Sequence, residues 1–265
     1  MKIINKVYNI ESNLNKKIVL ISDIHYSNKK DINKLNYILD NIKKLKPNYI
    51  CIPGDIIDES NIEDEKDFIR WLKKLSKISK VIISIGNHEF YINKHKNIFG
   101  LNKVFLEKIS SIENVYLLDN KNIVIDNINF IGITLPLEYY GEKNIESVNK
   151  YLNKIKLYKK YYNILLCHST LNICNSKILK DKNIDLILCG HMHGGIVPNF
   201  MRKIFKNRGF ISPNKKLFPK ITYGYLKIGN TNIIISSGIK VIPYRLIDKF
   251  FRSEIVNINL TFKEK

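Results

Sequence analysis

Five of the six histidines in this chain lie in short polar clusters, and each cluster directly follows an apolar run. Such runs are typical of buried β-strands, so each cluster falls where a strand should end. The clusters are, in order, Asp23-Ile24-His25, Gly54-Asp55, Gly86-Asn87-His88-Glu89, His168 and Gly190-His191-Met192-His193. Because they are spread from residue 23 to residue 193, one folded domain must bring them together. Histidines grouped in this way with Asp and Asn indicate a metal centre.

The rest of the chain is typical of one large globular protein. It has 265 residues, of which 45% are hydrophobic, and this composition excludes a disordered chain. No apolar run approaches the roughly 20 residues that span a bilayer. The N-terminus lacks the apolar core of a signal peptide, so we expect a cytoplasmic protein, with peripheral contact to the inner face of the membrane as a further option.

The four cysteines show no Cys-x-x-Cys pair and no disulfide-like spacing. Cys51, Cys167 and Cys189 each lie in an apolar stretch just before a cluster. We expect them to be buried, reduced strand residues rather than metal ligands.

The net charge is +20, from 44 basic and 24 acidic residues. Such a field attracts nucleic acids, anionic membranes and phosphorylated substrates alike. One stretch is particularly basic, because no acidic residue lies between Asp185 and Asp248. Large apolar residues alternate there with Arg and Lys, above all in residues 196–220. This segment is expected to be a basic loop insertion that either contacts a membrane or an acylated phosphate substrate, or is a solvated loop whose aromatics pack on the domain.

Hydrophobic periodicity predicts an α/β protein. Helices are expected at residues 31–46, 62–79, 99–112 and 146–162. Strands are expected at residues 17–23, 49–52, 81–85, 115–118, 123–125, 128–133, 163–167 and 185–189, and then at 221–228, 232–236 and 254–260. Gly229-Asn230 is a hairpin signal. We expect a single domain over residues 1–265, with an α/β half followed by a half that is mostly β.

The residue types also narrow the chemistry. In open α/β sheets the loops at the carboxyl ends of the strands converge and carry the site. Imidazoles, carboxylates and one amide, without a thiolate, suit Mn²⁺, Fe or Zn²⁺ in a catalytic rather than a structural site. Seven candidates are too many for one tetrahedral ion and suit two metals that share a carboxylate: Asp23, His25, Asp55, Asn87, His168, His191 and His193.

The order of these motifs resembles that of the calcineurin-like metallophosphoesterases. Asp-x-His, Gly-Asp-x-x-Asp, Gly-Asn-His-Glu, a lone His and Gly-His-x-His follow one another as they do in that family. His193-Gly194-Gly195, Tyr223-Gly224-Tyr225 and residues 238–245 are similar to the bacterial YkuE-like branch. The resemblance implies a four-layer α/β/β/α sandwich of two mixed β-sheets.

The resemblance also implies a role for each residue. Asp23, His25 and His193 would hold one divalent metal, Asn87, His168 and His191 would hold the other, and Asp55 would bridge the two. His88 would not be a ligand but would stabilise the phosphate and protonate the leaving oxygen. Asp58 would pair with His88, although a helix cap is a competing role for it. Arg245 would bind substrate phosphate, or else form a structural ion pair. Glu89 is expected only to support its loop.

The leading functional hypothesis is therefore a phosphoesterase in which a metal-bridging hydroxide attacks phosphorus. The related branch suggests a phosphodiester or pyrophosphate bond in a nucleotide or lipid-linked substrate, with Mn²⁺ as the favoured metal. A nuclease or cyclic-nucleotide phosphodiesterase is the alternative within the enzyme class, although the chain carries no nucleic-acid-binding motif. A non-catalytic metal-containing scaffold or a membrane-surface binding protein is the alternative outside that class.

Overall fold

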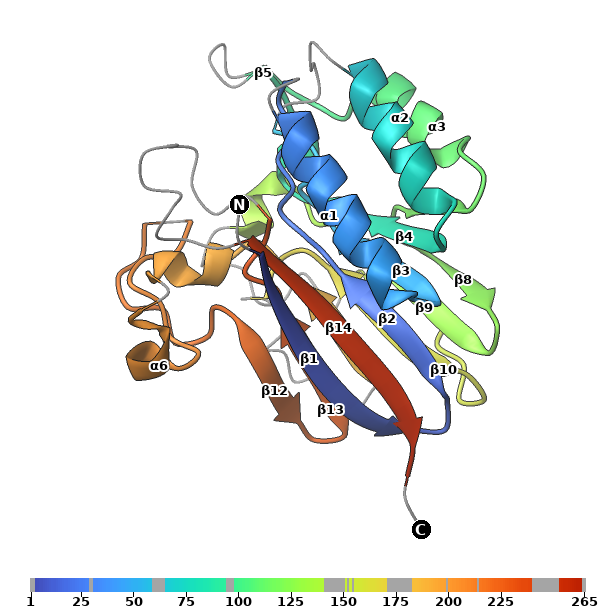
Figure 1. Ribbon diagram of the computed structural model, residues 1–265, viewed down its shortest axis with the longest axis vertical. Helices are drawn as coiled ribbons and strands as arrows, with labels where there is room; N and C mark the ends of the chain where they lie inside the picture. Colours follow the sequence, from blue (N-terminus) through green and yellow to red (C-terminus); the bar gives the residue numbers. More distant parts are fainter. Residues whose placement is uncertain are drawn as a thin grey trace.

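The fold is built around two six-stranded mixed β-sheets (Figure 1). The structure is a computed structural model. It describes residues 3–28, 31–58, 65–93, 98–140, 151, 153, 155–170, 183–198, 200–213, 215–239 and 253–263. In these residues no helix combines the length and the apolar character that crossing a bilayer requires.

The first sheet joins the two ends of the described chain. β14 lies between β1, to which it is parallel, and β2, to which it is antiparallel, and the last four strands run parallel to one another. Its strand order is β1 (Ile3–Ser12), β14 (Ser253–Phe262), β2 (Lys16–Leu20), β3 (Tyr49–Pro53), β4 (Lys80–Ser84) and β7 (Val115–Leu118).

The second sheet has a parallel centre and an antiparallel strand at each edge. Its strand order is β12 (Gly224–Ile228), β13 (Thr231–Ile235), β11 (Leu186–Cys189), β10 (Tyr162–Cys167), β9 (Ile128–Ile133) and β8 (Lys121–Ile125). β12 and β13 form the hairpin expected at Gly229-Asn230. A separate two-stranded ribbon consists of β5 (Tyr91–Asn93) and β6 (Ile98–Phe99).

Three apolar layers hold the sheets in place. Successive side chains of a strand point to opposite faces, so Val19 packs toward the helices while Ile18 and Leu20 pack between the sheets. The outer face of the first sheet is covered by α1 (Ile32–Leu45), α2 (Glu65–Ser76) and α3 (Lys103–Ser110), which Figure 1 shows together on one side. The third layer covers the other face of the second sheet and includes Tyr140 from η3 (Leu137–Tyr140).

The expected α/β class and the two mixed sheets are confirmed, but two expectations need correction. The helix expected at residues 146–162 is wrong in its last part, because residues 155–161 are not helical and Tyr162 begins β10. Ile155 is buried in the apolar cluster of the second sheet although it is not part of a helix. The edge strand β1 was missed, since among its residues only Ile10 is fully buried. The domain limits 1–265 stay a prediction.

Candidate metal centre

The polar clusters converge at the carboxyl ends of the central strands of both sheets. Parallel strands end at the same edge of a sheet, and side chains that follow strands of the two different sheets lie within contact distance, as His168 and Asp55 do at 2.9 Å. Along the chain, Asp23 and His25 follow β2, Asp55 follows β3, Asn87 and His88 follow β4, His168 follows β10, and His191 and His193 follow β11. The site therefore combines loops from the first sheet with loops from the second.

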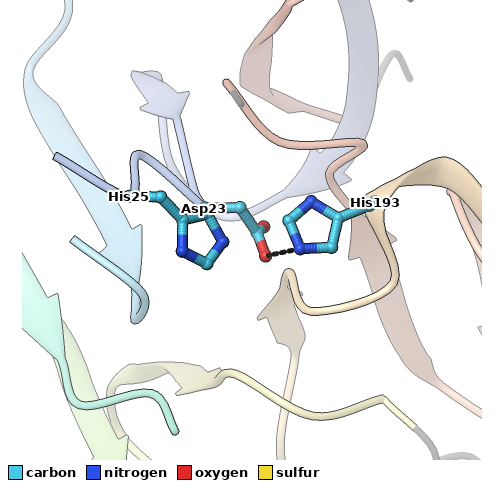
Figure 2. Close-up of side chains that lie close together, drawn as sticks. All are labelled: Asp23, His25 and His193. Carbon is cyan, nitrogen blue, oxygen red and sulfur yellow. Dashed lines mark ion pairs between the residues drawn. The ribbon is translucent and has the colours of Figure 1, made fainter. Parts of the chain in front are cut away.

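One group of candidate ligands consists of Asp23, His25 and His193, whose ligand atoms all lie within 4.8 Å of one another. Figure 2 shows the two imidazoles on either side of the Asp23 carboxylate. His193 Nε2 lies 3.6 Å from Asp23 Oδ1. The two rings are stacked, with their centroids 5.1 Å apart. This arrangement offers two imidazoles and a carboxylate to one point.

A second group consists of Asp55, His168 and His191, again with ligand atoms within 4.8 Å of one another. His168 Nδ1 lies 2.6 Å from the carbonyl oxygen of Pro53. A carbonyl can only accept, so Nδ1–H is the donor and Nε2 is the nitrogen that faces Asp55, at 2.9 Å from Oδ2. Metal-binding histidines are commonly oriented by such a bond from the other ring nitrogen.

Asp55 belongs to the second group and also forms a cluster with His25 and His88, whose ligand atoms again lie within 4.8 Å of one another. Its Oδ2 is 2.9 Å from His168 Nε2 and 3.7 Å from His25 Nε2, so the same oxygen faces one imidazole from each group. Its Oδ1 accepts a hydrogen bond from the backbone N–H of His88 at 2.9 Å, which fixes the orientation of the carboxylate. A carboxylate in this position can contact two ions at once.

The backbone around the site is strained. Five of the seven candidate ligands have a positive φ, a region that non-glycine residues seldom occupy: Asp23 (51°), His25 (47°), Asp55 (51°), His191 (71°) and His193 (46°). Such strain costs about 1–3 kcal/mol per residue and is concentrated at functional sites. Close approach is also needed, because a Cβ on Gly86 would lie 2.3 Å from Asp55 Oδ1.

Unsatisfied polar atoms show that a metal suits this donor set. Asn87 Oδ1 and His191 Nε2 are buried, and neither has a hydrogen-bond partner among the described residues. Buried polar atoms without a partner are rare and costly in folded proteins. Oxygen and imidazole nitrogen are ligands that Mn²⁺, Fe and Zn²⁺ accept. The residues present therefore fit a divalent metal centre.

The two carboxylates are held in the charged form. Burial by itself raises the pKa of Asp55, but His168, His88 and His25 together outweigh it and hold the pKa well below its usual range. Burial likewise raises the pKa of Asp23, and the neighbouring His193 and His168 lower it overall. Charged carboxylates are the form that binds metal.

The imidazoles divide into two kinds. Burial, reinforced by His168, lowers the pKa of His191 to about 3, and burial together with His88 lowers that of His25 to about 4. Both rings are therefore neutral near pH 7, as a metal ligand must be. Burial also disfavours the charged form of His168, but Asp55, Asp23 and the Pro53 carbonyl together overcome this and raise its pKa to about 9, so metal binding at Nε2 would displace a proton.

His88 and Asp58 lie on the open side of the site. His88 Nδ1 is 3.1 Å from Asp58 Oδ1 and 3.0 Å from the Asp58 carbonyl oxygen, while Nε2 is 3.9 Å from Asp55 Oδ2. The side chains of His88 and Asp58 are 20% and 33% exposed, whereas that of Asp55 is 1% exposed. The imidazole therefore separates the buried carboxylate from solvent.

Glu89 is more closely involved than sequence reasoning expected. Its carboxylate is buried and accepts four backbone N–H groups, from Gly86 at 2.6 Å, Ile56 at 2.8 Å, Asp55 at 3.0 Å and Ile57 at 3.3 Å. It thus ties the loop after β3 to the loop after β4. Burial and the Asp55 charge raise its pKa to about 7. The Gly-Asn-His-Glu motif was the available signal.

Two further expectations have different outcomes. Cys51, Cys167 and Cys189 are buried and form no disulfide within the described residues, as expected, and burial raises the pKa of the Cys51 thiol. Arg245, expected to bind phosphate, lies outside the described residues.

Comparison with known proteins gives the same family as the motifs. A family model described as calcineurin-like phosphoesterase matches residues 16–195, which include every cluster. An uncharacterized metallophosphoesterase of Campylobacter jejuni is 28% identical over 94% of this chain and 60% of its own length. One from Helicobacter pylori is 28% identical over 84% of this chain and 54% of its own length. The uncharacterized metallophosphoesterase YkuE of Bacillus subtilis is 24% identical over 88% of this chain and 76% of its own length.

This chain thus spans little more than half the length of the first two relatives. Because the family model covers most of the chain, the protein belongs to the calcineurin-like phosphoesterase family.

Proposed function

We propose that this protein hydrolyses a phosphodiester or pyrophosphate bond with the help of two divalent metal ions. The observation that carries the proposal is the shared position of Asp55, whose Oδ2 faces His25 and His168 from the two groups of candidate ligands. Paired ions that share a carboxylate are suited to phosphoryl transfer. The family to which the chain belongs supports the same reaction class.

The proposed ligands form two sets. Asp23, His25 and His193 hold one ion, Asn87, His168 and His191 hold the other, and Asp55 contacts both. Asn87 is assigned to the second set from the family resemblance, and its buried Oδ1, which has no hydrogen-bond partner among the described residues, is available as a ligand. When bound, the ions polarise the phosphoryl oxygens and activate water for attack on phosphorus. Mn²⁺ is the proposed metal, and Fe and Zn²⁺ are the alternatives that the experiment below compares with it.

His88 is proposed as the general acid. Its Nδ1 is positioned by Asp58, which leaves Nε2 as the nitrogen that faces the substrate side. The proton on Nε2 passes to the oxygen that departs from phosphorus, and the charged imidazole also stabilises the extra negative charge of the transition state. A general acid placed in this way contributes about 10²–10⁴ in rate. Asp58 acts through His88 and is therefore a positioning residue.

The experiment combines metal analysis with hydrolysis. Metal-depleted protein is loaded with Mn²⁺, Fe²⁺, Zn²⁺ or Co²⁺, the bound metal is counted by mass spectrometry, and hydrolysis of bis-p-nitrophenyl phosphate, p-nitrophenyl phosphate and single-stranded DNA is measured. His191→Ala should lose bound metal and activity together. His88→Ala should keep its metal and lose most of its activity on a diester with a poor leaving group, and lose much less on the p-nitrophenyl esters, because p-nitrophenolate departs without a proton. His95→Ala is the matched control, because His95 is the one histidine outside the clusters.

Each alternative predicts a different outcome. Bound metal without hydrolysis of any ester would favour a non-catalytic scaffold. Faster cleavage of DNA than of the small diester would favour a nuclease. Full activity of His88→Ala on a diester with a poor leaving group would remove the general acid from the mechanism, while the same loss in His95→Ala would make the histidine effects nonspecific.

A further inference from the structure

The most exposed apolar side chains of the described residues lie together in one short segment. Phe200, Ile204, Leu217 and Phe218 are 73%, 77%, 65% and 64% exposed, and no other large apolar side chain in the described ranges exceeds these values. Single exposed apolar residues are ordinary, whereas a group of them marks a surface that contacts another partner. We call these four residues, with the exposed basic residues between and beside them, the basic-apolar surface.

The charged residues in the segment that carries these side chains are all basic. The basic-apolar surface includes the exposed residues Lys203, Lys206, Arg208, Lys215, Lys216 and Lys220. The whole sequence from residue 186 to residue 247 contains no acidic residue. The complementary partner is therefore negatively charged and apolar at once.

The segment is fixed to the domain rather than loosely attached. Arg202, at the start of α6 (Arg202–Phe205), points inward, where Nη1 donates to Ser237 Oγ at 3.1 Å and lies 3.5 Å from Glu254 Oε2. Its guanidinium also lies 4.9 Å from the ring centroid of Tyr223. The exposed groups are thus held in place before any partner arrives, which reduces the entropy cost of binding.

Aromatic contacts join the two halves of the segment. The rings of Phe205 and Phe210 are 4.2 Å apart, and those of Phe210 and Phe218 are 6.4 Å apart. Ile211 and Leu217 form an isolated antiparallel bridge. The exposed residues near 200 and near 218 therefore belong to one surface.

The basic-apolar surface adjoins the candidate metal centre. The carbonyl of Gly195, two residues after His193, accepts hydrogen bonds from the backbone N–H groups of Phe210 and Ile211 at 2.8 and 3.2 Å. In Figure 1, α6 lies on the side of the molecule away from α2 and α3. A partner bound to this surface would lie beside the loop that carries His191 and His193.

We propose that the basic-apolar surface docks on an anionic lipid bilayer. Large apolar side chains enter the boundary between headgroups and acyl chains, while Lys and Arg attract the lipid phosphates. A second copy of the chain fits less well, because two strongly basic surfaces would repel each other. Nucleic acid would leave the four apolar side chains in water. The proposal does not depend on the reaction that the metal centre performs.

The test is co-sedimentation with vesicles of phosphatidylcholine alone or mixed with phosphatidylglycerol, at low and high salt. The protein should bind the anionic vesicles at low salt. Phe200→Ser/Ile204→Ser should bind at least ~10-fold more weakly, because two anchoring side chains are lost. Lys203→Gln/Arg208→Gln should also bind more than ~10-fold more weakly at low salt, since each basic residue near the surface contributes about fivefold.

Matched controls separate docking from net charge. Val104→Ser on α3 and Lys73→Gln/Lys74→Gln on α2 remove exposed apolar and basic groups elsewhere, and they should bind as the unchanged protein does. Circular dichroism checks that all variants fold. Equal binding by Phe200→Ser/Ile204→Ser and the unchanged protein would overturn the proposal, because net charge alone would then explain adhesion. Absence of vesicle binding, with a dimer that this variant dissociates, would assign the surface to a second copy instead.

Discussion

The Glu89 carboxylate accepts a hydrogen bond from the backbone N–H of Asp55 at 3.0 Å, although the two residues follow different strands. The same Oε2 accepts from Gly86 at 2.6 Å, while Oε1 accepts from Ile56 and Ile57. Asp55 has a positive φ and faces histidines from both groups of candidate ligands. Glu89 thus holds the strained loop that carries Asp55, and the Asp55 carboxylate joins the two groups of candidate ligands.

Glu89→Gln should therefore weaken metal binding without removing a ligand. The amide NH₂ of Gln would face two of the N–H groups that Glu89 now satisfies. We expect a loss of about 2–4 kcal/mol in the free energy of unfolding, since each buried unsatisfied group costs about 1–3 kcal/mol. Metal affinity should fall about 10–100-fold, as for other residues that orient ligands. Urea unfolding of the metal-free protein and metal titration measure the two effects.

The matched control for this change is Glu107→Gln, at an exposed position on α3. It should alter neither measurement. Unchanged metal affinity in Glu89→Gln, together with the lower stability, would limit Glu89 to a role in folding.

His88 and Asp58 should differ from the ligands in what they affect. His88→Asn should leave the metal content unchanged and reduce kcat about 10²–10⁴-fold on a diester with a poor leaving group. The loss should be much smaller with p-nitrophenolate, which departs without a proton. Asp58→Asn should reduce kcat less than His88→Asn and should have no added effect in the double variant. An equal loss on both leaving groups would contradict proton donation by His88.

Gly86 should not tolerate a side chain. In Gly86→Ala the new Cβ would lie 2.3 Å from Asp55 Oδ1, so the carboxylate or the loop must move. We expect the bound metal to decrease by at least half, measured by mass spectrometry. Gly229→Ala is the control, because its Cβ would meet nothing within 4 Å and its positive φ costs only about 1–2 kcal/mol. Full metal content in Gly86→Ala would show that the close approach is not required.

A polar contact at the start of β3, at the end of the strand opposite the candidate site, should make the free energy of unfolding depend on pH. Tyr49 donates to Asp126 Oδ2 at 2.7 Å, and Lys80 Nζ lies 3.0 Å from the same oxygen. The hydrogen bond from Tyr49, and then Lys80, lower the pKa of Asp126. A lowered pKa stabilises the fold above the unfolded value of about 4, and this stabilisation is lost as the pH falls through the folded value.

Asp126→Asn should therefore cost less than about 1 kcal/mol near neutral pH, because Asp126 is half exposed. The difference from the unchanged protein should shrink toward about pH 3, where the unfolded carboxyl is protonated. Urea unfolding at both pH values measures it, and the exposed Asp119 provides the control Asp119→Asn. A difference that does not change with pH would exclude the ionic contribution.

The sequence predicted the strands that carry the site because their residues are buried on both faces. Ile50 and Ile52 pack toward the helices, while Cys51 packs between the sheets, so β3 appears as a continuous apolar run. The strand β1 lacks this signal, since it lies at an edge and pairs with β14 from the other end of the chain. No local pattern reports such a pairing.

The candidate ligands could be named from their motifs, but their geometry could not. The contact of Glu89 with Ile56 joins residues 33 positions apart, and a lone Glu in a loop is compatible with many roles. The left-handed backbone of Asp55 is also invisible in sequence, because it is imposed by the packing of two loops. Likewise, exposed apolar residues near residue 200 look like core residues until the fold shows that nothing described covers them.

The most direct test of the central claim is anomalous X-ray diffraction from crystals of the Mn²⁺-loaded protein. We predict two metal peaks per chain, one beside Asp23, His25 and His193 and one beside Asn87, His168 and His191, with the Asp55 carboxylate between them. Two metals that share a carboxylate lie about 3.5–4 Å apart. A single peak, or two peaks of which neither contacts Asp55, would contradict the account.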